Sequence, residues 1–295
     1  MSNQEIVIEK EVKSPSKVKD YVMLLKLRLS FLVVLSAISG WFFAGGHFNL
    51  DFLYLVLGGF LITGSSNGFN QIIERDIDKK MSRTANRPLP TGRMTVTEAM
   101  IASFSFGIIG LIFLFQLNFY AGILGGLALF MYVFLYTPLK RISPWAVFVG
   151  AFPGAIPPML GAVAVTGKFD MLVGIMFFVQ FAWQFPHFWA IAWVSDEDYS
   201  KGGFSLLPSK KRKDKISATW ILVSALFMIP AGILPYLYEH TGLVSLIIGT
   251  LAGLWFFSIA LRFYLSLDDK LARKLMFASF LYLPIIQFLY VFNQV

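Results

Sequence analysis

Hydrophobic residues along this chain fall into long continuous blocks separated by polar loops. Each block has about 20 residues, enough for a helix to cross the hydrocarbon core of a bilayer. A membrane β-barrel would instead require alternating apolar and polar residues. The pattern predicts an all-α integral membrane protein, a single bundle of nine transmembrane helices within residues 21–295, after a polar tail at residues 1–20. The expected spans are 22–45, 52–73, 97–116, 119–137, 145–166, 171–194, 217–238, 243–265 and 273–292.

The composition agrees with a membrane protein. Hydrophobic residues make up 57% of the chain, charged residues 14%, and the mean hydropathy is +0.68. Soluble domains carry about 25% charged residues, so these charges could not cover a soluble surface. The chain has no cysteine, which excludes a thiolate nucleophile and cysteine-ligated metals.

Positive charge is distributed unevenly between the loops. Of 25 Lys and Arg residues, only Lys168 lies in the short loops 46–51, 116–118, 166–170 and 238–242. Basic loops stay in the cytoplasm, so the bias predicts a cytoplasmic N-terminus and an outer C-terminus. It also explains the net charge of +8 without nucleic acid. We expect a multi-pass protein of the plasma or inner membrane, with its basic loops facing the cytoplasm.

The first candidate site lies where the second span ends. Asn70, Glu74 and Asp78 recur every four residues, so a regular helix places them on one face. Two carboxylates and an amide are ligands for a hard cation, Mg²⁺ first, which usually bridges carboxylates to phosphate. In a regular helix the Asp76 side chain does not lie on this face.

Arg83 and Arg87 follow within a few residues and suit phosphate through their bidentate geometry. A solvated helix end is the alternative reading. In that case the acids pair with Arg75, Lys79 and Lys80, and bind no substrate.

A second acid cluster follows the sixth span at Asp196, Glu197 and Asp198. The distribution of basic residues between the loops places it on the same membrane face as the first cluster. Two such clusters favour a polyanionic substrate held through more than one Mg²⁺. Lys140 and Arg141 lie on that face too, where they are either phosphate contacts or topology signals.

His187 lies inside the apolar block 171–194. Ionisable groups are costly in a span and usually face a cavity or a polar partner. His187 is therefore either a structural histidine bonded to a neighbouring helix or a group that contacts substrate. Three prolines, Pro153, Pro157 and Pro158, interrupt the fifth span, which is tolerated where a helix packs in protein or lines a cavity.

These segments together resemble a known family. The run Asn70-x3-Glu74-x3-Asp78, followed by Arg83-Thr-Ala-Asn-Arg87-Pro-Leu-Pro-Thr-Gly92, is similar to the first acidic motif of the UbiA-type intramembrane prenyltransferases. The resemblance covers nearly the whole chain. The stretches 74–81, 136–141, 153–158 and 183–188 are most similar to the branch that farnesylates haem.

The resemblance implies farnesyl transfer from farnesyl diphosphate to the 2-vinyl group of haem B, giving haem O, in a lipid-embedded enzyme that uses Mg²⁺. Haem A synthase is the implied partner. The implied metal-site and catalytic residues are Asn70, Glu74, Asp78, Asp196 and Asp198. The implied diphosphate-binding residues are Arg83, Arg87, Lys140 and Lys201. By position alone, Lys26 or Arg28 is expected to meet a haem propionate, and His187 to ligate or orient the haem iron.

The sequence departs from the family pattern in two places. Glu74 stands where most members have Asp, which changes reach but not charge. Val194 stands where the second motif has its first acid, so Asp196 and Asp198 form an incomplete cluster and a full second Mg²⁺ site does not carry over. Two rival functions are a prenyltransferase for an aromatic or quinone precursor, and a transporter or lipid-binding protein. A transporter would carry charges along a path through the membrane, whereas nearly all charges here lie at its edge.

Overall fold

A computed structural model describes residues 16–295 of the chain. Almost all regular structure in this part is helical, apart from one isolated β-bridge between Thr241 and Gln294. The elements are α1 (Lys17–Leu25), α2 (Leu27–Phe43), α3 (Leu50–Ile73), α4 (Arg75–Asp78), α5 (Val96–Leu117), α6 (Phe119–Phe130), the π-helical segment η1 (Met131–Tyr136), α7 (Thr137–Leu139), α8 (Ala146–Thr166), α9 (Met171–Val194), α10 (Asp196–Lys201), α11 (Lys215–Leu237), α12 (Leu243–Ser266) and α13 (Asp269–Phe292).

The number of membrane spans agrees with the hydrophobic pattern. Eight helical stretches in residues 16–295 are long and apolar enough to cross a bilayer, and α1 with α2, bent by 44°, makes a ninth. The prediction of an all-helical membrane bundle is confirmed. Its orientation across the membrane stays a prediction.

Helix α1 begins before residue 21, the expected start of the helical bundle. Residues 17–20 belong to α1, whose first turn is capped by Ser16. Asp20 is buried and pairs with Arg93 Nε at 2.9 Å, so α1 is fixed to the loop after α4. The rest of the expected tail, residues 1–15, lies outside the described residues.

Most long helices begin at a polar residue that precedes an apolar block. The first N–H groups of a helix have no partner within it, and a side-chain oxygen at the N-cap accepts from one of them. Six N-caps of this kind start α3, α5, α6, α9, α11 and α13, and they are Asn49, Thr95, Asn118, Asp170, Asp214 and Asp268. The loops between the apolar blocks therefore define where the spans start.

The long helices pack around two large apolar cores that share α8 and α9. One core joins them to α11, α12 and α13, and the other joins them to α2, α3, α5 and α6. The tightest approach is between α2 and α8, where a Cβ on Gly161 would lie 1.9 Å from the Ala37 carbonyl oxygen. Small residues at such contacts let membrane helices pack closely.

Three prolines leave α8 continuous. Pro158 has no N–H, so the carbonyl of Gly154, four residues earlier, loses its helical partner. Gln180 Nε2 on α9 donates to this carbonyl at 2.8 Å, and Gln287 on α13 donates to Gln180 Oε1 at 2.7 Å. The expectation that this span packs within protein is met by these side chains.

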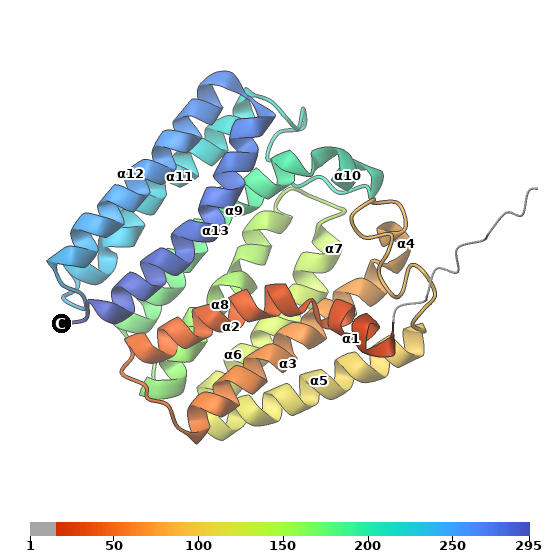
Figure 1. Ribbon diagram of the computed structural model, residues 1–295, viewed down its shortest axis with the longest axis horizontal. Helices are drawn as coiled ribbons and strands as arrows, with labels where there is room; N and C mark the ends of the chain where they lie inside the picture. Colours follow the sequence, from red (N-terminus) through yellow and green to blue (C-terminus); the bar gives the residue numbers. More distant parts are fainter. Residues whose placement is uncertain (1–15) are drawn as a thin grey trace, which may run out of the picture.

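The short helices α4, α7 and α10 gather at one end of the bundle, away from the C-terminus (Figure 1). Three of the basic loops, residues 79–95, 140–145 and 202–214, adjoin these elements. This end carries the polar pocket described next.

Candidate active site

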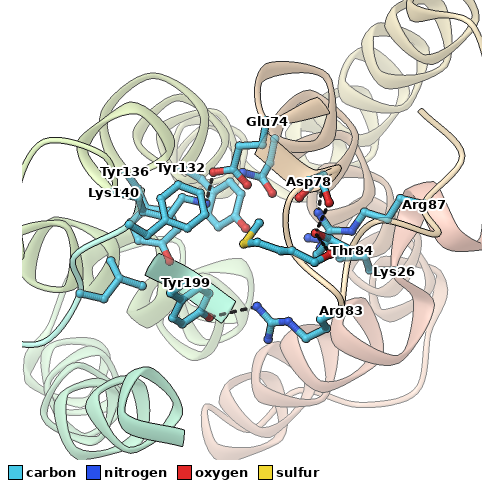
Figure 2. A pocket seen from close by; sticks show the side chains of 14 residues that line it. Lys26, Glu74, Asp78, Arg83, Thr84, Arg87, Tyr132, Tyr136, Lys140 and Tyr199 are labelled. Atoms are coloured by element: carbon cyan, nitrogen blue, oxygen red, sulfur yellow. Dashed lines mark hydrogen bonds and ion pairs between the residues drawn. The ribbon is translucent and has the colours of Figure 1, made fainter. Parts of the chain in front are cut away.

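A polar pocket lies between the ends of α3, α4, α7 and α10. Its cavity volume is about 120 Å³, which is small, and most of its lining side chains are polar or charged. Figure 2 shows its acidic and basic side chains pointing toward one another across the opening. The lining residues are Lys26, Asn70, Glu74, Asp78, Met81, Arg83, Thr84, Arg87, Tyr132, Tyr136, Lys140, Tyr199, Phe204 and Leu206.

Asn70, Glu74 and Asp78 line this pocket together, although α3 ends at Ile73. The backbone keeps the four-residue step across the junction. Glu74 N donates to Asn70 O at 3.0 Å, and Asp78 N donates to Glu74 O at 2.8 Å. The three side chains therefore stay on one face. Asp76 points outward and pairs with Lys79 at 3.0 Å.

Each buried carboxylate has its own cation. Arg87 Nη1 lies 2.6 Å from Asp78 Oδ2, and Lys140 Nζ pairs with Glu74 Oε1. Burial raises the pKa of Asp78 while Arg87 opposes the rise, and burial lowers the pKa of Lys140 while Glu74 opposes the fall. The alternative interpretation was a solvated helix end whose acids pair with Arg75, Lys79 and Lys80. It holds for Asp76, but not for Glu74 or Asp78.

Asp198 does not line the pocket. It accepts hydrogen bonds from Ser82 N at 2.8 Å, Ser82 Oγ at 2.9 Å and Arg83 N at 3.3 Å. Burial favours the protonated form of Asp198, but the bonds from Ser82 and Arg83 outweigh it, and the pKa is lowered. Asp198 thus fixes the loop after α4 to α10.

The other polar groups of the second cluster also lie outside the pocket lining. Asp196 pairs with Arg212 at 2.8 Å. Lys201 is exposed, with its Nζ 3.9 Å from Asp198 Oδ1. The structure therefore brings the first acidic segment together with Arg83, Arg87 and Lys140. Of the second cluster, Asp198 holds the loop that carries Arg83, whereas Asp196 is held by Arg212.

Aromatic side chains form the wall of the pocket opposite the charged side chains, and the sequence alone did not indicate a role for these particular residues. Tyr132 and Tyr136 come from η1, and their ring centroids are 5.3 Å apart. Lys140 Nζ lies 4.9 Å from the Tyr136 ring centroid and 5.3 Å from that of Phe204. Arg83 donates to the Tyr199 hydroxyl at 3.2 Å. A π-helical segment often marks a functional site, but the sequence carries no simple signal for it.

The three residues expected to meet haem are separated. Lys26 lines the polar pocket, whereas Arg28 is exposed. His187 is buried in α9, outside the pocket lining, and stacks on Trp183 at 4.1 Å between ring centroids.

The pocket fits a hard cation shared with an anionic ligand. Asp78 Oδ1 is buried and has no hydrogen-bond partner within residues 16–295, and Asn70 and Glu74 add oxygen atoms beside it. Across residues 16–295, no three Asp, Glu, His or Cys side chains gather closely enough to hold a metal alone. Mg²⁺ commonly takes one or two carboxylates together with substrate phosphates, which matches this donor set.

A multi-pass helical membrane protein with a buried acid–base pocket at one end of its bundle is the class that this fold and site define. The model of the UbiA prenyltransferase family matches residues 32–283, and the chain belongs to this family. A protein of Cytophaga hutchinsonii named protoheme IX farnesyltransferase is 48% identical over 286 residues, which cover 95% of this chain and 99% of that protein.

Solved structures share the fold. A structure described as digeranylgeranylglyceryl phosphate synthase aligns with a TM-score of 0.78 at 20% identity, over 94% of this chain and 98% of that one. A UbiA homologue from Archaeoglobus fulgidus bound to GPP and Mg²⁺ aligns with a TM-score of 0.61 at 14% identity, over 92% and 99%. The prediction of a UbiA-type fold is confirmed.

Proposed function

We propose that this protein transfers the farnesyl group of farnesyl diphosphate to the 2-vinyl group of haem B and so forms haem O. The observation that carries the proposal is the 48% identity, over almost the full length of both chains, to a protein named protoheme IX farnesyltransferase. The pocket supports it chemically, because buried carboxylates and several cations line the same space.

Departure of an allylic diphosphate places negative charge on the leaving group. Arg83, Arg87 and Lys140 supply preorganised positive charge where that group would lie. Asn70, Glu74 and Asp78 would hold Mg²⁺, and the homologue bound to GPP and Mg²⁺ supports such a cation here. When bound, Mg²⁺ acts as a Lewis acid toward the diphosphate.

The prenyl carbon becomes positive as the diphosphate leaves. The faces of Tyr132 and Tyr136, at the same pocket, can stabilise this charge through their π-electrons. No side-chain nucleophile is required, because the vinyl double bond attacks the prenyl carbon. Water then adds to the resulting cation at the porphyrin side chain and loses a proton, which gives a hydroxyethylfarnesyl group.

Product analysis tests the proposal. Membranes carrying the protein are incubated with haem B, farnesyl diphosphate and Mg²⁺, and the extracted haems are separated by HPLC with mass detection. We expect haem O, and none when Mg²⁺ is removed with a chelator. Prenylation of 4-hydroxybenzoate or a naphthoate in a parallel assay, without haem O, would keep the fold and overturn the acceptor.

We further propose that His187 contacts the haem iron through Nε2. Ser279 Oγ donates to Met276 O at 2.6 Å, so its single proton is used there and it accepts from His187 Nδ1, 2.7 Å away. In the neutral imidazole, Nε2 is then the unprotonated nitrogen, the form that ligates metals. Arg28 remains the candidate for a haem propionate.

A His187→Ala variant is expected to lose about 10-fold or more in haem affinity, with a shifted absorption band of the bound ferric haem. Spectrophotometric titration of the purified protein with haem measures both quantities. His47→Ala, which removes an exposed histidine from an outer loop, is the matched control and should bind as the wild type does. An unchanged spectrum, affinity and turnover in His187→Ala would contradict the ligand role.

The membrane location and the partner are proposed from the charge of the loops and from the reaction product. Basic loops at the pocket end favour a plasma or inner membrane protein whose site opens to the cytoplasm. A haem A synthase, which uses haem O, is the proposed partner. Asp198, with Lys201 beside it, is proposed to act through the loop that bears Arg83, since Asp198 bonds to that loop directly. Asp196 is proposed to act through Arg212, with which it pairs.

A further inference from the structure

The first span is broken at Lys26. Helix α1 ends at Leu25 and α2 begins at Leu27, and Lys26 between them has φ 47° and ψ 56°. This left-handed conformation is unfavourable for a residue with a side chain. No glycine or proline accounts for the break, so neighbouring elements must stabilise it.

Side chains of the neighbouring helices satisfy the carbonyls that the break exposes. Gln71 Nε2 on α3 donates to Leu24 O at 2.8 Å and to Met23 O at 3.3 Å. Ser30 Oγ on α2 donates to Leu25 O at 2.8 Å, and Asn67 Nδ2 on α3 donates to the same oxygen at 3.3 Å. Gln71 and Asn67 are themselves buried. The break is therefore an ordered feature held by three polar side chains.

The break places Lys26 at the lining of the polar pocket, beside Arg87 and Thr84 (Figure 2). The charged groups that face it are Arg87, Lys140, Glu74 and Asp78. Arg87 and Lys140 are each paired with a carboxylate, and Arg83 donates to Tyr199. Among the described residues, no hydrogen-bond or ion-pair partner of the Lys26 ammonium is found.

The pocket thus holds more positive than negative charge. Its lining contains four cationic side chains, Lys26, Arg83, Arg87 and Lys140, against the two carboxylates Glu74 and Asp78. A partly buried ammonium without a counter-ion is unfavourable unless an anion binds beside it. A haem propionate would have to enter this same polar space, which a diphosphate occupies in the proposed reaction.

We propose that Lys26 binds the diphosphate of the prenyl substrate, and that the break between α1 and α2 positions it to do so. This inference rests on the proposed function. It assigns Lys26 to the leaving group rather than to the haem acceptor.

Binding of inorganic diphosphate with Mg²⁺ to the purified full-length protein, measured by isothermal titration calorimetry, tests the assignment. Lys26→Met should weaken binding by about 10- to 100-fold, as expected for loss of one charge-assisted hydrogen bond. It should raise KM for the prenyl diphosphate and leave KM for haem B unchanged. Lys19→Met, which removes an exposed charge from α1, should bind within about twofold of the wild type.

Two further variants separate the ammonium from the backbone. Lys26→Arg should retain most of the affinity. Lys26→Gly should fold at least as well as the wild type, because glycine adopts this conformation readily, yet bind diphosphate as weakly as Lys26→Met. Wild-type diphosphate affinity in Lys26→Met would overturn the assignment while the proposed function stands, and a raised KM for haem B would then indicate a propionate. A wild-type protein that binds no diphosphate would overturn both.

Discussion

Replacing Asp78 with alanine is expected to lower haem O formation by about 10²- to 10³-fold. Asp78 is fully buried in the pocket, and its Oδ1 has no hydrogen-bond partner in the part of the chain that the structure describes. It is therefore the oxygen best placed to accept a cation shared with the diphosphate. The substitution also frees Arg87, whose guanidinium is held at 2.6 Å by the other oxygen. HPLC with mass detection of haems from membranes of matched protein content measures the loss.

Asp76→Ala is the matched control for this prediction. Asp76 lies two residues away, but its side chain is 70% exposed and pairs with Lys79 on the surface. Its loss should change activity by no more than about twofold, since surface ion pairs contribute little. Asp78→Asn keeps the shape and an acceptor for Arg87 but removes the charge, and it should be as inactive as Asp78→Ala. An active Asp78→Asn would show that the carboxylate charge is not required.

The spacing of the acids was enough to predict their common face. The i, i+4, i+8 pattern of Asn70, Glu74 and Asp78 survives the helix junction because Glu74 N and Asp78 N keep their bonds four residues back. The nine spans follow from the apolar blocks, whose ends coincide with N-cap residues such as Asn49 and Asn118. These features depend on residues close together in the sequence.

Features that depend on distant partners could not be predicted. Asp198 resembles a metal ligand in the sequence, yet its carboxylate is used by Ser82 and Arg83, more than 100 residues away. The break at Lys26 has no local signal, because the side chains that hold it come mainly from α3. Arg212 bonds Asp196 across a loop whose conformation only the folded chain defines. Tertiary contacts therefore decide which acids of the two motifs stay available for a ligand.

A double-mutant cycle on Glu74 and Lys140 separates the structural role of their ion pair from its chemical role. Both side chains are buried, with exposed fractions of 5% and 9%. Glu74→Gln or Lys140→Met alone leaves one charge buried without its partner, which costs about 3–5 kcal/mol of unfolding free energy. The double variant removes both charges. Its loss of stability should be smaller than the sum of the single losses by about 1–3 kcal/mol.

Activity should not recover with stability. Glu74 and Lys140 both line the space proposed for the diphosphate, and they carry opposite charges. The double variant therefore lacks both a ligand for the cation and a contact to the phosphate. We expect all three variants to form haem O about 10²-fold or more slowly than the wild type. Thermal unfolding in detergent gives the stability terms, and haem O quantification gives the rates. If the double variant regained wild-type turnover, the pair would serve only to neutralise two buried charges. If the double variant regains stability but its turnover stays low, impaired folding cannot explain the loss of activity. Both groups would then be assigned to the reaction.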